Sequence, residues 1–181
     1  PSDHVDFVLQ NGMDAWAITD HGNANGHAHL ASHAAKLKKQ GQKFRPLFGV
    51  EFYFVPSLSE WKVQHQNRHI LKKQVQDIIS ETEVEGVATV EDEDGKEEVG
   101  LVLEDEDATK KVDLDLKEYK RRYHLVVVAR DRKGLSNLFT LVRKSYAVGF
   151  YMYPRIDFQM LKQHGEGLIV STACVGGLLS N

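Results

Sequence analysis

Apolar side chains in the first third of the chain alternate between short continuous runs and helical stripes. Residues 2–10 predict a short helix, and residues 15–19 (AWAIT) predict a buried strand. Residues 26–40 have apolar or small side chains at helical spacing and end in lysines, which predicts a second helix. Residues 44–55 (FRPLFGVEFYFV) return as a strand rich in aromatic and branched residues. A strand, a helix and a strand in this order are typical of a parallel crossover unit.

The same alternation returns near the end of the chain. Residues 123–129 (YHLVVVA) predict a strand, and residues 131–148 predict a helix with leucine and valine on one face. Residues 156–164 predict a short helix, and residues 167–172 (GLIVST) predict another buried strand. This order implies a second crossover unit. The repeated pattern predicts an α/β fold, built either as a barrel or as an open parallel sheet.

The middle of the chain, residues 56–122, has a different pattern. It is polar and acidic, and residues 70–79 predict a helix. The stretch GVATVEDEDGKEEVGLVLED has two interpretations: a hairpin that turns at Asp94 and Gly95, or a solvated insertion with marginal local structure, which is the simpler one. We therefore expect residues 1–55 and 123–181 to form one domain and residues 56–122 to form an insertion within it.

Composition is ordinary for a globular protein, with 41% apolar and 27% charged residues in a chain of 181. No window approaches the run of about 18 apolar residues that spans a bilayer, and residues 1–10 lack the features of a signal peptide. Cys174 is the only cysteine, so intramolecular disulfides are excluded and a reducing compartment fits. We expect a cytoplasmic protein without a membrane partner.

The net charge of −3 conceals a strong asymmetry. Residues 81–107 hold 13 acids and one base, a charge of −12, so the rest of the chain carries +9. A basic remainder suits a polyanionic partner such as nucleic acid. The acidic segment has two interpretations, a mimic of nucleic acid that limits access to a site or a solvated spacer, and we favour the spacer.

Four predicted strands carry a candidate metal ligand at or near an end: His21, Glu51, His124 and Cys174. Imidazole, carboxylate and thiolate groups bind zinc, iron or manganese, and a barrel gathers such side chains into one mouth. Asp20 precedes His21 and is a candidate to orient it as a carboxylate behind the ligands.

Each of these residues also has a structural interpretation. A lone buried cysteine is usually a small apolar side chain, and a glutamate in an apolar strand is often paired with a base. Glu51 is the most informative residue, because burying its carboxylate between Val50 and Phe52 is costly unless a positive group meets it. A metal ion or a basic side chain would serve equally.

Three further histidines lie on the predicted second helix. His27 and His29 are two residues apart, so they point in different directions and do not share an ion. His29 and His33 do share a face, but without the glutamate of an H-E-x-x-H motif a solvated helix face is favoured over a zinc site. The marks of serine hydrolases, Walker loops and dinucleotide folds are absent from the sequence.

Four sequence blocks together resemble the PHP (polymerase and histidinol phosphatase) domain at the start of bacterial replicative DNA polymerases, the DNA polymerase III alpha subunits. Their order and spacing agree over roughly residues 3–55 and 123–181. The blocks are GMDAWAITDHGNANG, FRPLFGVEFYFVP, YHLVVVARDRKGLSNLFTLVRKSYAVGFYMYPRID and EGLIVSTACVGG.

The resemblance implies a distorted seven-stranded TIM-like (β/α) barrel whose mouth holds two or three divalent metal ions, usually zinc, manganese or iron. It assigns ligand roles to His21, Glu51, His124 and Cys174 and only a supporting role to Asp20. The family's first block, an H-x-H, is expected before the first residue, and its last, a D-x-H, after the final one. The chain therefore resembles an incomplete part of the domain.

For function, the resemblance implies part of a replicative DNA polymerase whose partners are DNA, the remaining polymerase domains and other replisome subunits. Two roles stay open: metal-dependent 3′ to 5′ exonucleolytic proofreading, and a structural platform that holds a separate proofreading exonuclease subunit. A small-molecule phosphatase is a third, disfavoured because GFYMYPRID is similar to the polymerase branch. Tyr153 stands where that branch has a basic residue, which leaves a phosphate contact there open. The palm carboxylates of polymerisation are absent from the sequence, so these residues alone are not expected to polymerise.

Overall fold

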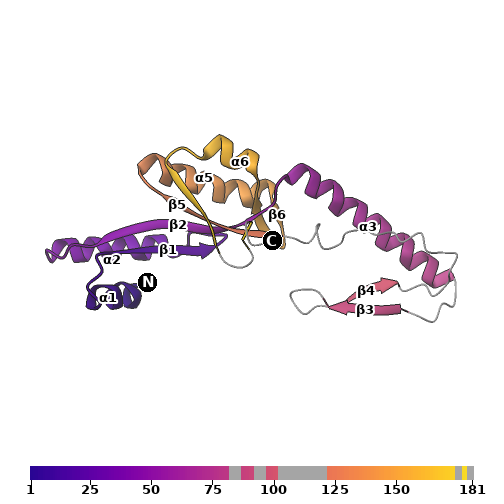
Figure 1. Cartoon of the computed structure of the whole chain (residues 1–181), viewed down its shortest axis with the longest axis horizontal. Coiled ribbons are helices and arrows are strands. Elements are labelled where there is room, and N and C mark those ends of the chain that lie inside the picture. The colour runs from indigo at the N-terminus through magenta and orange to yellow at the C-terminus, as the bar shows by residue number, and fades with distance from the viewer. Residues whose placement is uncertain (82–86, 92–96, 102–121, 174–176, 179–181) are drawn as a thin grey trace. The chain divides into compact units, whose positions relative to one another are not determined.

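The structure is a computed structural model that describes all residues except 82–86, 92–96, 102–121, 174–176 and 179–181. The chain divides into two compact units (Figure 1). One comprises Pro1–Leu58 with Arg121–Asn181, and the other comprises Ser59–Lys120. Each unit is described by itself below.

The first unit is a mixed α/β structure built on one sheet of six described strands. Strand β2 is the longest and lies at its centre, because β1 and β7 pair with one edge of it and β5 pairs with the other. The strands are β1 (Ala15–His21), β2 (Arg45–Phe54), β5 (Tyr123–Ala129), β6 (Phe150–Tyr151), β7 (Tyr153–Ile156) and β8 (Leu168–Thr172).

Strand direction departs from the prediction in one place. β1 runs parallel to β2 as expected, and so does β7, a strand that the sequence pattern did not predict, but β5 runs antiparallel to β2, and β8 antiparallel to β5. The second parallel crossover unit was therefore a wrong prediction. Its physical reason is that an apolar run such as YHLVVVA shows that a strand is buried but carries no information on its direction. The described sheet is also open and not closed into a barrel.

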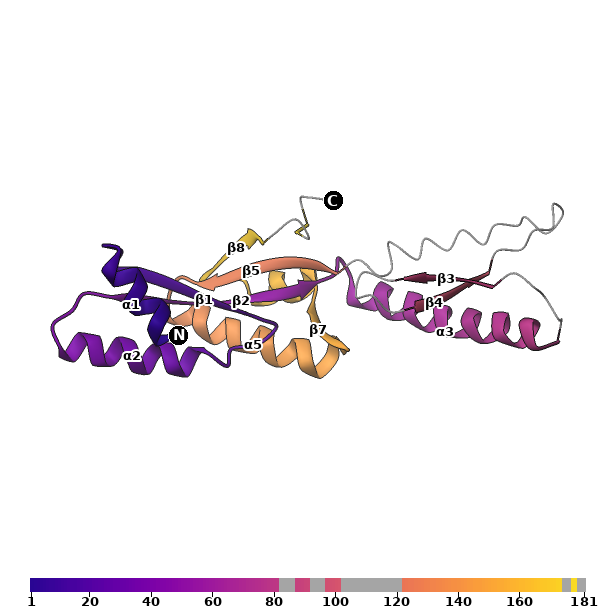
Figure 2. The ribbon, with the colours of Figure 1, turned by 90° about the horizontal axis from the view of Figure 1, so that it is seen from below.

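The described part of this unit contains four helices, and α2 and α5 lie along the same side of the sheet (Figure 2). On β2, Val50, Phe52 and Phe54 are fully buried, whereas Glu51 and Tyr53, which alternate with them, are only half-buried. The strand therefore has a core face and a second face that carries polar groups. The helices are α1 (Ser2–Gln10), α2 (His27–Lys39), α5 (Arg132–Val148) and α6 (Phe158–His164).

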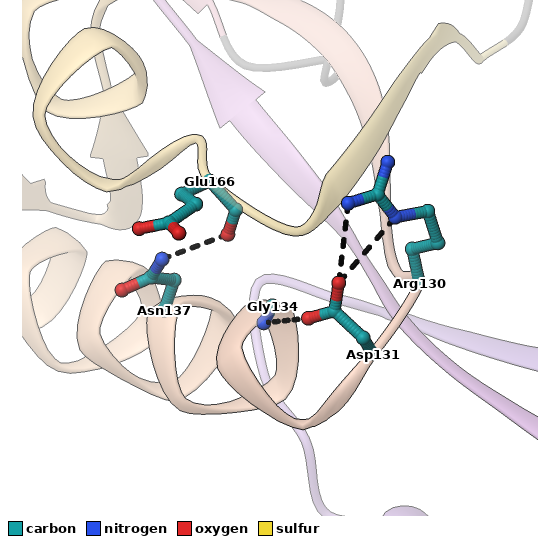
Figure 3. Close-up of polar contacts among 5 residues, drawn as sticks. All are labelled: Arg130, Asp131, Gly134, Asn137 and Glu166. Carbon is teal, nitrogen blue, oxygen red and sulfur yellow. Dashed lines mark hydrogen bonds and ion pairs between the residues drawn. The ribbon is translucent and has the colours of Figure 1, made fainter.

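The start of α5 is fixed to the turn before β8 (Figure 3). Asp131 caps the helix by accepting the Gly134 amide at 2.8 Å, and this bond is the main cause that holds the pKa of Asp131 below its ordinary value. Arg130 bonds the same carboxylate at 3.2 Å, and Asn137 donates to the Glu166 carbonyl at 2.8 Å. The loop between α6 and β8 is thus bound to the helix that covers β5.

The second unit contains a long helix and a strand pair. Helix α3 (Leu58–Glu81) begins earlier than the predicted helix over 70–79 and ends close to it. Strands β3 (Val87–Glu91) and β4 (Glu97–Leu101) pair antiparallel, with Glu91 opposite Glu97. These residues therefore form the strands of the hairpin interpretation and not the marginal structure of the simpler one, while the turn at Asp94 and Gly95 lies outside the described residues. No helix in the described part of either unit combines the length and apolar character needed to cross a membrane.

Candidate metal centre

The strand register brings three of the predicted ligands onto one face of the sheet. His21 is the direct neighbour of Glu51 across the parallel β1–β2 pair. On the other edge of β2, His124 stands opposite Tyr53, which places it diagonally from Glu51 on the same face. Neighbouring strands lie about 4.8 Å apart, so side chains at these positions can touch.

The three side chains do meet. His124 Nδ1 donates to Glu51 Oε1 at 2.8 Å, and His21 Nε2 lies 3.7 Å from Glu51 Oε2. The two imidazole rings are 5.5 Å apart at their centres and nearly perpendicular. The side chain of His21 is 57% exposed, whereas those of Glu51 and His124 are 15% and 23% exposed. One ligand atom from each residue lies within 4.8 Å of the other two, and among the described residues this is the one group of three His, Cys, Asp or Glu side chains found so close together.

This donor set fits a divalent metal ion. Two imidazole nitrogens and a carboxylate are ligands of zinc, iron and manganese. Ligand atoms about 2.1 Å from a tetrahedral ion lie roughly 3.4 Å from one another, which is close to the 3.7 Å between His21 and Glu51. The shorter contact from His124 is a hydrogen bond, and in the neutral ring it leaves the Nε2 lone pair available. The contacts with the two imidazoles also give the half-buried Glu51 carboxylate polar partners.

The loop after His21 explains why the TDHGN sequence is so polar. Its backbone is bound back to the site: the Gly22 amide donates to the Glu51 carbonyl at 2.8 Å, and the Asn23 side chain donates to the His21 carbonyl at 2.8 Å. The Asn25 amide in turn bonds Asn23 Oδ1 at 3.0 Å. These bonds fix the backbone from which the His21 ring projects.

Asp20 supports this loop and does not contact the imidazole in any described hydrogen bond. Its Oδ2 accepts the Gly26 amide at 2.9 Å and so closes the turn that leads into α2. Because neighbouring residues of a strand point to opposite faces, the carboxylate of Asp20 faces away from that of Glu51. Asp20 therefore bonds the backbone of the loop and not the His21 ring, and its supporting role toward His21 stays a prediction.

A group of contacting side chains borders the three candidate ligands, and of its members the sequence analysis singled out only Tyr153. The Tyr53 ring lies 5.3 Å from the His124 ring and 6.2 Å from the His21 ring, measured between centres. Tyr153 packs on Tyr53 at 4.8 Å, and the Arg122 guanidinium lies over the Tyr153 ring at 4.1 Å. Tyr53 could have been found from the two-residue period of β2, which sets it beside Glu51. The other two come together only in the folded chain.

The remaining histidines of α2 have other surroundings. His27 is buried, and its Nε2 donates to the Gly49 carbonyl at 2.8 Å. His33 bonds Asp6 at 3.2 Å, and His29 is exposed. None of them belongs to the group of candidate ligands found among the described residues.

Cys174, the fourth predicted ligand, lies outside the described residues. The described backbone on both sides of it runs beside His124: Thr172 pairs with Leu125, and Gly177 forms a bridge with His124. The structure thus brings together three of the four predicted ligands, and the role of the fourth stays a prediction.

An α/β chain with histidines and a glutamate at adjoining strand positions defines a class of candidate metal-binding domains. Comparison with known families identifies the class: the chain matches the PHP domain over residues 1–181 and belongs to that family.

Its relatives share one printed name. Over 180 residues it is 28% identical to the DNA polymerase III subunit alpha of Borreliella burgdorferi, which covers 98% of this chain and 11% of that protein. Over 162 residues it is 27% identical to the same subunit of Deinococcus radiodurans, covering 90% of this chain and 8% of the relative. In Aquifex aeolicus the identity rises to 49% over 59 residues, 33% of this chain and 5% of the relative. The chain thus spans about a tenth or less of the length of these relatives.

Proposed function

We propose that this chain is part of the PHP domain of a replicative DNA polymerase, a DNA polymerase III alpha subunit, and that its partners are DNA and the other domains of that polymerase. Alignment to such a subunit over 98% of the chain supports the assignment. We propose further that the sheet is a segment of a distorted seven-stranded barrel. The outer strand β8 is consistent with this, since Ile169 and Val170 on it are about half exposed in the structure.

The proposed site binds divalent metal ions through His21, Glu51 and His124, with Cys174 as a further ligand and Asp20 in support. The contact of two imidazoles with one half-buried carboxylate is the observation that carries this proposal. The position of Thr172 and Gly177 beside β5 supports the inclusion of Cys174, since the chain enters and leaves that residue near His124. Zinc, manganese and iron all suit this set of donors.

The proposed reaction is hydrolysis of a phosphodiester at the 3′ end of a DNA strand. Divalent ions held by His21, Glu51 and His124 would polarise the phosphate and make a water molecule a stronger nucleophile. The protein contributes the geometry: Glu51 holds His124 by a hydrogen bond, and the loop bonds of Gly22 and Asn23 hold His21. His21 is the most exposed of the three side chains, so a substrate approaches the site from its side.

Metal analysis of the chain tests the centre. Glu51→Gln keeps the shape of the side chain but removes its charge, and we expect at least a tenfold loss of bound zinc or manganese by elemental analysis after dialysis. Glu166→Gln, at an exposed glutamate on the loop before β8, is the matched control and should retain the metal. Equal metal content in the wild-type chain and the Glu51 variant would refute the centre.

A structural platform for a proofreading subunit is the second candidate function. Three consecutive apolar side chains on and after β6, Phe150, Tyr151 and Met152, are 55%, 42% and 55% exposed, as expected of a surface that packs on another domain or subunit. Nuclease assays on a mismatched primer, with a longer chain that extends beyond both ends of this one, separate the two roles. Metal that is bound without metal-dependent cleavage supports the platform, and cleavage lost in the Glu51 variant supports the exonuclease.

A further inference from the structure

Arg122, Tyr153 and Tyr53 form a continuous stack, here called the Arg122 stack, that reaches the edge of the candidate metal centre. The guanidinium carbon lies 4.1 Å from the Tyr153 ring centre and 5.9 Å from that of Tyr53. Tyr53 then meets the His124 ring edge-on, at an interplanar angle of 89°. The Tyr53 ring alone therefore lies between the Arg122 guanidinium and the candidate ligand His124.

The position of this arginine is set by rigid elements. Arg122 directly precedes β5, Tyr53 lies on β2 opposite His124, and Tyr153 begins β7, which pairs with the same strand β2. A guanidinium over an aromatic ring at this distance gains a cation–π attraction. A guanidinium carries five N–H donors, enough for an anion as well as for contacts within the protein. Arg122 can therefore bind an anion in addition to its contacts within the protein.

We infer that the Arg122 stack binds a backbone phosphate of a polynucleotide strand whose end lies at the candidate metal centre. A guanidinium offers paired N–H donors that match phosphate oxygens, and a ring at its back keeps it directed. The strand would run along the sheet face from the three ligands across Tyr53 to Arg122. This inference rests on the proposed function, because it takes a nucleic-acid strand as the substrate.

Binding of a single-stranded oligonucleotide to the full 181-residue chain tests the inference without catalysis. The probe is a labelled oligothymidylate of about eight nucleotides, followed by fluorescence anisotropy with a chelator present and over a salt series. We expect Arg122→Ala to weaken binding about five- to tenfold and to lower the salt slope by roughly 0.7, the value for one phosphate contact on a single strand. Arg122→Lys keeps the positive charge but lacks the paired N–H donors of the guanidinium. Its affinity for the oligonucleotide should therefore lie between those of the wild type and Arg122→Ala.

Arg130 offers the matched control, because it follows the opposite end of the same strand β5 and is paired with Asp131. Arg130→Ala should leave the affinity within twofold of the wild type. An equal loss of affinity in both arginine variants, or no loss in Arg122→Ala, would overturn the inference.

The contribution of the Tyr153 ring is tested by combining two substitutions. In a Tyr153→Leu background, Arg122→Ala should weaken binding less than in the wild type, because the Tyr153→Leu variant has already lost the ring that directs the guanidinium. Full additivity of the two changes contradicts the stack.

Two further measurements separate this inference from the proposed metal centre and from a small phosphate ligand. Arg122→Ala should retain the metal, and Glu51→Gln should retain oligonucleotide binding in chelator, so each proposal can fail alone. Inorganic phosphate should compete with the oligonucleotide only at concentrations at least a hundredfold above the oligonucleotide dissociation constant. Competition by inorganic phosphate at concentrations near the oligonucleotide dissociation constant would indicate that Arg122 binds a small phosphate ligand. It would overturn the inference that the ligand is a polynucleotide.

Discussion

At the residue scale, Gly22 determines the backbone geometry of the turn next to the candidate metal centre. Its φ is +66°, in the left-handed region that disfavours side chains. A Cβ at this position would also lie 2.8 Å from Pro154 Cγ and 3.6 Å from Tyr53 Cε2. Both the turn after His21 and the contact with β7 therefore require glycine here.

Gly22→Ala should destabilise the chain by about 2 kcal/mol and weaken metal binding. Forcing alanine into the left-handed region costs about 1–2 kcal/mol, and the contact with Pro154 adds to it. The loop should relax by a shift of the His21 backbone, which would move one of the three candidate ligands. Denaturant unfolding and metal titration measure the two effects. Gly12→Ala is the control, because Gly12 has a φ of +74° but no heavy atom within 4 Å of the added carbon. It should lose stability only by the backbone contribution and should bind metal normally.

His164, at the end of α6, gives the stability of the chain a pH dependence. Burial lowers its pKa below 6.5, and Lys144, Arg143 and Lys133 lower it further. The folded state thus favours the neutral ring, so the contribution of this group is complete above pH 6.5 and is lost as the pH falls through the lower folded pKa.

His164→Gln should reduce the fall of the melting temperature between about pH 7.5 and pH 5. Thermal unfolding at several pH values measures this slope. His29→Gln, at an exposed position on α2, controls for the removal of a histidine in general. A slope reduced equally in both variants, or unchanged in the His164 variant, contradicts the assignment.

At the scale of elements, the close approach of α5 to the turn before β8 depends on two glycines. A Cβ on Gly134 would lie 1.8 Å from the Gly167 carbonyl oxygen and 2.5 Å from its carbonyl carbon. That same carbonyl accepts the Arg130 amide at 2.9 Å, so it is held from both sides. At these two glycines the helix and the turn therefore meet backbone to backbone, with no room for a side chain on Gly134.

Gly134→Ala should destabilise the chain by about 2 kcal/mol or more. Alanine gains up to about 1 kcal/mol of helix propensity over glycine, but separating two packed backbone segments in a full core costs more. Ser136→Ala, at an exposed position of the same helix, changes stability by less than about 0.5 kcal/mol and serves as control. If the Gly134→Ala variant were more stable in urea than the wild type, the turn before β8 could move away from the helix at little cost in free energy, which would contradict this prediction.

The elements that the sequence predicted correctly are those determined by the hydrophobic pattern within a single segment of the chain. The strand over 15–19 and the helix over 26–40 are confirmed as β1 and α2, and the later helix over 131–148 as α5. The direction of β5 was not local information, because pairing partners decide it. Of the candidate site, the apolar runs placed His21, Glu51 and His124 near strand ends, while their meeting depends on register, which no single run contains. The Arg122 stack was missed for the same reason, since its residues come from three separate segments.

At the scale of the whole molecule, the segment between β2 and β5, predicted to be an insertion, leaves and re-enters the sheet next to the candidate metal centre. Phe54 and Tyr123, which flank it, are paired residues at the end of β2 and β5, one position from Tyr53 and His124. The segment 81–107 carries a charge of −12, so its removal changes the net charge of the chain from −3 to +9. Such a change tests whether the acidic residues repel DNA from the site.

Deletion of residues 81–107 should leave the affinity for single-stranded DNA within about twofold at 0.15 M salt, as expected of a spacer. At this ionic strength the Debye length is about 8 Å, so acidic residues act on bound DNA only from very near the site. At about 0.01 M salt the Debye length is near 30 Å, and the deletion should then strengthen binding through the changed net charge alone.

An acidic segment that occupies the site would instead compete with DNA directly. Its deletion would raise the affinity at 0.15 M as well, and Arg122→Ala in the deleted chain would then reveal a larger loss than in the full chain. Titrations of both chains at the two salt concentrations therefore separate a distant charge from an occupant of the site.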